Sequence, residues 1–136
     1  MEPLDMSEIL MDAYHLADQI NESEEVKNYL QLKKKLQENE EAQRLIKEFQ
    51  RVKSLYEEAQ RFGIFHPNYH EAKEKAERFQ KKLRQHPLIS AYLEAEEKLD
   101  QLLYEVSATI AHSISETIKV PSNQPRSIRK KSCHRK

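Results

Sequence analysis

Apolar residues recur along most of this chain at intervals of three and four positions, the spacing that places side chains on one face of an α-helix. The clearest stripe lies within residues 40–62. Its members are Ala42, Leu45, Phe49, Val52, Tyr56 and Ala59. A heptad stripe of this kind favours long packing against a neighbouring helix.

Four other segments carry the same spacing, and the pattern predicts helices at about 7–20, 23–38, 68–86 and 87–118. Ser7, Ser23 and Asn39 are the predicted N-caps, because their side-chain oxygens can accept a bond from a free first-turn N–H. Proline disfavours helical geometry at the residue before it and suits a first helical turn, so Pro87 predicts a break at His86.

These elements predict an all-α fold: an antiparallel bundle of about five helices, the last three long. Apolar residues make up 38% of the chain and charged residues 34%, and mean hydropathy is −0.91. The apolar stripes are narrow, so we expect a homodimer or a higher oligomer to complete the core. The single glycine excludes phosphate-binding loops and dinucleotide-binding motifs, which need several.

The stretch "RFGIFHPNY", residues 61–69, interrupts the helical pattern and contains that glycine, Gly63. Glycine accepts the left-handed geometry that commonly ends a helix, which favours a corner between two helices. We therefore interpret this stretch as a structural corner or a partner contact. Its candidate residues are Arg61, Phe62, Gly63, His66, Pro67 and Tyr69.

A metal site is the alternative interpretation of the same stretch. His66 and His70 lie four positions apart with Glu71 beside them, and on a helix this spacing can bring two imidazoles to one metal ion. However, Pro67 follows His66, which favours placing His66 in the corner. No paired carboxylates mark a catalytic site, so we expect no enzyme activity and no small-molecule substrate.

The C-terminal segment 119–136 differs from the rest of the chain. It holds seven of the 23 basic residues and none of the 23 acidic ones, so residues 1–118 carry a net charge of −7. We predict a helical domain over 1–118 and a basic, disordered tail over 119–136. The tail could bind RNA, a membrane surface or an acidic protein through its charge. It also carries the only cysteine, Cys133, whose thiolate the basic neighbours would favour.

The N-terminus "MEPLDMSEIL" lacks the basic and apolar regions of a signal peptide. No apolar run approaches the ~18 residues of a membrane span. We therefore expect a cytoplasmic protein without membrane insertion.

Two runs carry a resemblance to a known family: "YEEAQRFGIFHPNYHEA" and "AYLEAEEKLDQLLYEVSATIAHSISETIKVPSNQP". The chain resembles the YlbF/YmcA family of bacterial regulators from its first helix to about Pro125. The most specific parts are Arg61-Phe62-Gly63 with His66-Pro67-x-Tyr69, and Glu105-Val106-Ser107 leading to Lys119-Val120-Pro121.

The resemblance implies a small, helical, non-catalytic cytoplasmic protein that acts in a complex with YmcA-like and YaaT-like partners. It also implies roles in competence, sporulation and biofilm formation, and in mRNA processing that depends on ribonuclease Y (RNase Y). The family is linked to a bound [4Fe-4S] cluster held by cysteines. Cys133 is the only cysteine in this chain, so it would be one ligand of a cluster shared with partner chains.

Overall fold

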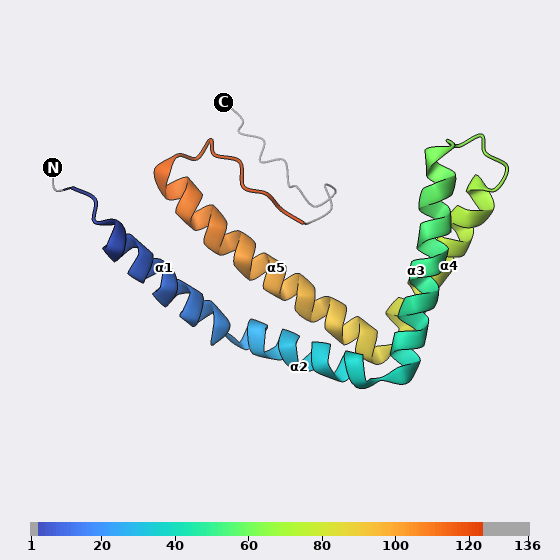
Figure 1. Ribbon diagram of the computed structural model, residues 1–136, viewed down its shortest axis with the longest axis horizontal. Helices are drawn as coiled ribbons and strands as arrows, with labels where there is room; N and C mark the ends of the chain where they lie inside the picture. Colours follow the sequence, from blue (N-terminus) through green and yellow to red (C-terminus); the bar gives the residue numbers. More distant parts are fainter. Residues whose placement is uncertain (1–2, 124–136) are drawn as a thin grey trace, which may run out of the picture.

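The computed structural model describes residues 3–123, which form two helical arms meeting at an elbow (Figure 1). Within these residues the chain has five α-helices and no strand, so the predicted all-α class is confirmed. In chain order the helices are α1 (Met6–Asn21), α2 (Glu24–Glu38), α3 (Glu40–Arg61), α4 (Tyr69–Gln85) and α5 (Pro87–Ile114).

The helices pack in two groups. In the long arm, α1 and α2 follow one another along one side, and α5 packs against α2 (Figure 1). In the short arm, α3 and α4 form a hairpin whose connection lies at the far tip. Both strongly packed pairs, α2 with α5 and α3 with α4, therefore run from the elbow towards the ends of the molecule.

A small apolar core fills the elbow. Leu36, Ala42, Leu83 and Ile89 are buried together, and they come from the ends of four different helices. Partly buried apolar residues surround this cluster: Leu45, Ile46, Phe49, Leu88 and Tyr92. Because one cluster receives residues from all four helices, it holds the two arms together.

The long arm has a second point of attachment, a pair of tyrosines on α2 and α5. The Tyr29 and Tyr92 hydroxyl oxygens lie 3.3 Å apart in a hydrogen bond, and their ring centroids are 5.5 Å apart. This hydrogen bond, with a smaller contribution from burial, raises the pKa of Tyr92 well above its usual value.

Side-chain caps explain where the central helices begin. Ser23 Oγ accepts from the Val26 amide at 3.4 Å, and Asn39 Oδ1 accepts from the Ala42 amide at 2.8 Å, which confirms both predicted caps. The predicted cap at Ser7 is wrong. Asp5 is the N-cap of α1, and its carboxylate accepts from the Ser7 amide at 2.9 Å, so Ser7 lies in the first turn.

The last helix ends at Ile114, earlier than the predicted boundary near residue 118. Ser115 is extended, with φ −158° and ψ 132°. Its hydroxyl lies 2.8 Å from the Thr117 hydroxyl and accepts from the Thr117 amide at 3.4 Å. Serine and threonine side chains that bond to nearby backbone offer it an alternative to the helix, which accounts for the early end.

After this turn the chain reverses and runs back beside α5 as far as residue 123 (Figure 1). Pro121, Ser122 and Asn123 lie over Asp100, Leu103, Tyr104 and Ser107 of that helix. The division into a helical domain and a tail at residue 118 stays a prediction. Cys133 and most of the basic segment lie outside the described residues.

None of the five described helices is long and apolar enough to cross a membrane.

Candidate functional site

Gly63 and a short series of backbone hydrogen bonds form the corner at residues 61–69. Gly63 has a φ of +87°, and its amide donates to the Gln60 carbonyl at 3.1 Å, which closes the end of α3. The His66 amide then donates to the Gly63 carbonyl, and the Tyr69 amide to the His66 carbonyl, each at 3.0 Å. The predicted left-handed glycine at the helix end is therefore confirmed.

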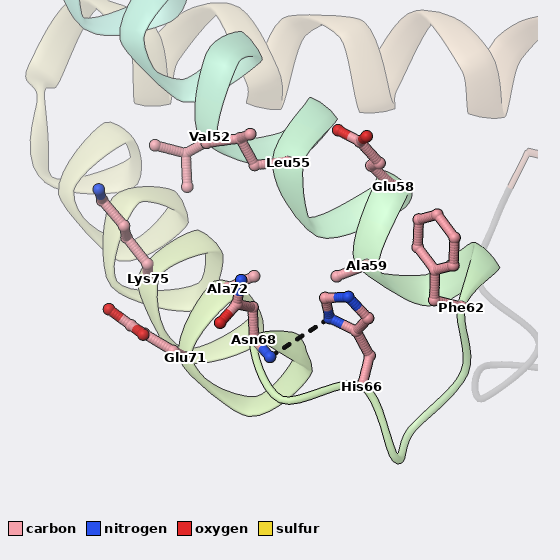
Figure 2. A pocket seen from close by; sticks show the side chains of 10 residues that line it. All are labelled: Val52, Leu55, Glu58, Ala59, Phe62, His66, Asn68, Glu71, Ala72 and Lys75. Atoms are coloured by element: carbon pink, nitrogen blue, oxygen red, sulfur yellow. Dashed lines mark hydrogen bonds between the residues drawn. The ribbon is translucent and has the colours of Figure 1, made fainter.

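A groove of about 400 Å³ lies between α3 and α4 beside this corner (Figure 2). Its lining is Val52, Leu55, Glu58, Ala59, Phe62, His66, Asn68, Glu71, Ala72 and Lys75. The floor is apolar and the rim carries two carboxylates and one ammonium group. Such a lining suits a partner side chain that is apolar at its tip, with polar neighbours around it.

His66 belongs to the wall of the groove. Its Nδ1 accepts from the Asn68 amide at 3.3 Å, and its ring centroid lies 5.2 Å from that of Phe62. His70 instead lies in the first turn of α4, with its ring edge-on to Tyr69 at 5.3 Å. Over residues 3–123 no group of three or more His, Cys, Asp or Glu side chains could hold a metal ion. The metal-site hypothesis gains no support from this arrangement.

Tyr69 joins the two helices of the hairpin just beyond the corner. Its ring centroid lies 5.8 Å from that of Tyr56 on α3. A hydrogen bond with the Tyr56 hydroxyl is the main cause that raises the pKa of Tyr69. Tyr56 in turn accepts from Gln60 Nε2 at 3.0 Å.

The structure divides the corner residues predicted from the sequence. Phe62 and His66 line the groove, whereas Arg61 and Pro67 are exposed and do not line it. Sequence reasoning missed Leu55, Glu58 and Lys75 as lining residues. A signal was present for Leu55 alone, because Leu55 precedes Ala59 and Phe62 at helical spacing of four and three positions.

The long arm presents a second candidate surface. α1 contains no buried residue, although apolar side chains recur along it. Its large exposed apolar residues are Met6, Ile9, Leu10, Met11 and Tyr14. The C-terminal half of α5 adds Leu103, Ile110 and Ile114. Apolar side chains gathered at one end of a molecule mark a protein–protein contact more often than a solvated face.

Comparisons with known proteins support a regulatory family. The sequence pattern of the family described as "Control of competence regulator ComK, YlbF/YmcA" matches residues 9–115. The "Regulatory protein YlbF" of Bacillus subtilis (strain 168) is 40% identical over 114 residues, which span 84% of this chain and 76% of that protein.

A solved structure extends the comparison to the fold. The crystal structure of Bacillus subtilis RicA in complex with RicF contains a chain that matches this one with a TM-score of 0.73 and 36% sequence identity. The match covers 85% of this chain and 100% of that chain. The similarity therefore includes the arrangement of most of the helical part.

Proposed function

This chain belongs to the YlbF/YmcA family of competence-control regulators, and we propose that it works as a non-catalytic adaptor. An adaptor acts by holding other chains together, so its function lies in its surfaces. The observation that carries this proposal is the unburied apolar face of α1. A helix of this composition gains stability when another chain covers that face.

The two arms supply two separate contact surfaces. The long arm offers apolar side chains of α1 and α5, and the short arm offers the groove beside Phe62 and His66. The surfaces lie at opposite ends of the molecule (Figure 1). One chain can therefore bind a partner, or a second copy of itself, on the long arm while the groove remains open.

The partners that we propose are YmcA-like and YaaT-like proteins, in the cytoplasm. The processes are RNase Y-dependent mRNA processing and the control of competence, sporulation and biofilm formation. Two observations support partners of this kind: the family resemblance, and the similarity to a chain solved as a complex of RicA with RicF.

We also propose that a [4Fe-4S] cluster of the complex takes one ligand from Cys133. Such clusters are held by four cysteine thiolates, and this chain has a single cysteine. The chain alone therefore does not match the donor set. The partner chains would have to supply the other ligands.

The test is a tagged pull-down of the full chain from its native cytoplasm under anaerobic conditions, with mass spectrometry of the eluate. We expect YmcA-like and YaaT-like chains with the wild type. Leu10→Glu, which places a charge at a 56% exposed position on α1, should weaken recovery about tenfold or more, or ~1.4 kcal/mol. The eluate of Cys133→Ser should contain less iron than the wild-type eluate.

The matched control is Leu55→Glu on α3, where the leucine is 52% exposed. It introduces the same charge in the groove of the short arm and should leave long-arm partners bound. Full recovery of partners by Leu10→Glu, or recovery of this chain alone by the wild type, would overturn the proposed adaptor function.

A further inference from the structure

An acidic groove of about 570 Å³ lies beside the first half of α5. It contains the carboxylates of Glu94, Glu96, Glu97 and Asp100, and a single cation, Arg84, from the end of α4. Leu93 and Ser90 complete its helical wall. We call this surface the acidic groove of α5. Its four carboxylates against one guanidinium leave a strong net negative charge.

The described chain ends at the rim of this groove. After the turn at Ser115, the backbone runs back along α5, on the side away from α2 (Figure 1). Asn123 lies beside Asp100 and lines the acidic groove itself. The returning segment therefore delivers the rest of the chain to the groove entrance.

The turn that directs this path is built from specific contacts. The Ile118 amide donates to the Ser115 carbonyl at 3.2 Å. The Ile118 carbonyl oxygen lies 3.2 Å from Nε2 of His112, two residues before the end of α5 at Ile114. Contacts at Ser115 and Ile118 thus set the direction of the segment before it reaches Asn123.

The sequence beyond Asn123 has the charge opposite to that of the groove. Residues 124–136 contain no acid. Their basic members are Arg126, Arg129, Lys130, Lys131, Arg135 and Lys136. Their length is sufficient: thirteen extended residues reach ~45 Å at ~3.4 Å each, and α5 from Asp100 to Pro87 is ~20 Å long at ~1.5 Å per residue.

We propose that the basic segment 124–136 docks in the acidic groove of α5 of its own chain. Three observations carry this proposal: residues 121–123 lie against α5, the described chain ends at the groove, and the groove and the segment have opposite charges. The proposal does not rest on the adaptor function. Tethering favours docking within the chain, because the segment starts at the groove and its effective concentration there is high. In the docked state the groove carboxylates already neutralise the positive charge of the segment. RNA or an acidic protein must therefore compete with the groove to bind the segment.

The test uses the only cysteine. A nitroxide spin label attached to Cys133 of the full chain broadens the NMR signals of nearby amides. We expect broadening on α5 between Ser90 and Asp100, and none at the hairpin tip near Gly63. In ~1 M salt, where the screening length falls to ~3 Å, the broadening should be lost.

Charge variants identify the surface. Glu94→Gln/Glu97→Gln/Asp100→Asn should abolish the broadening on α5. The matched control Glu48→Gln/Glu74→Gln/Glu77→Gln removes the same number of charges from exposed positions on the hairpin and should leave it unchanged. The salt measurement on the wild type needs no substitution, so it tests the proposal even if a variant fails to fold.

Mixing distinguishes the source of the segment. One portion of the chain carries the spin label but no isotope, and it is mixed with a second portion that is isotope-enriched but carries no spin label. Only the second portion gives NMR signals, so broadening in this sample reports docking between copies. We expect none. Broadening only in the mixed sample, broadening centred away from α5, or broadening that resists both salt and the triple substitution would overturn the proposal.

Discussion

At the residue scale, the tyrosine pair of the long arm links two positions 63 residues apart in the sequence. Neither residue is fully buried. The pair therefore contributes to stability through its hydrogen bond and ring contact more than through apolar surface removed from water. The raised pKa of Tyr92 means that the folded state holds the phenol proton more tightly than the unfolded state does. Stability therefore depends on pH at this site.

We expect Tyr92→Phe to lower the free energy of unfolding by about 1 kcal/mol near neutral pH, because it removes the hydroxyl pair. The wild-type contribution is present below pH ~10, the unfolded value, and is lost as pH rises through the raised pKa. Urea denaturation at pH 7 and at steps above pH 10 should show the difference between wild type and variant shrinking.

Tyr14→Phe on α1 is the control, since Tyr14 is an exposed tyrosine on another helix. It should leave the free energy of unfolding at pH 7 unchanged. If the free energies of unfolding of the wild type and Tyr92→Phe differ by the same amount at every pH, the proposed link between stability and the Tyr92 pKa is wrong.

Local residues were predictable from sequence and distant pairs were not. Gly63 and Asn39 act on backbone within a few positions, so their roles follow from residue type and order alone. Asp5 and Ser7 are both good caps two positions apart, and choosing between them depends on how the chain enters the helix. The pairing of Tyr29 with Tyr92 depends on the fold of everything between them.

At the scale of single elements, helix boundaries depend on whether a cap residue makes its bond. Asn39 and Asn68 occupy the N-cap positions of α3 and α4. Asn39 bonds the Ala42 amide, whereas Asn68 makes no side-chain cap bond. The two asparagines thus form a natural comparison within one molecule.

We expect Asn39→Ala to cost about 1 kcal/mol of stability, because it leaves a first-turn amide of α3 without its acceptor. Asn68→Ala should cost much less, since its backbone amide, which donates to His66, is retained. Thermal denaturation followed by circular dichroism compares them. Equal losses would mean that the cap bond at Asn39 contributes nothing.

The same scale explains why the groove residues were harder to predict than the helices. The heptad stripe correctly indicates a packed face on α3, but a groove also needs the partner helix and the corner that sets their spacing. Glu58 and Lys75 come together only because the connection at Gly63 places α4 beside α3. In the sequence they read as ordinary charged positions on a solvated face.

At the scale of the whole molecule, the elbow is where both arms depend on one set of side chains. Ile89 is 3% exposed and packs with residues from α2, α3 and α4. We expect Ile89→Ala to lower the free energy of unfolding by about 2–5 kcal/mol. Leu30→Ala, at a 54% exposed position on α2, should cost far less. Chemical denaturation measures both, and a small loss for Ile89→Ala would show that the arms are stable without the elbow.

The hairpin of the short arm also influences the order in which the chain can assemble. Pairing α2 with α5 closes a loop that contains all of α3 and α4, and the entropy cost of closure grows with loop length. Once α3 and α4 have paired through their short connection, the effective loop is only the elbow itself. Local pairing is fast and distant pairing is slow. A substitution at the hairpin corner therefore slows formation of the long arm without touching either of its helices.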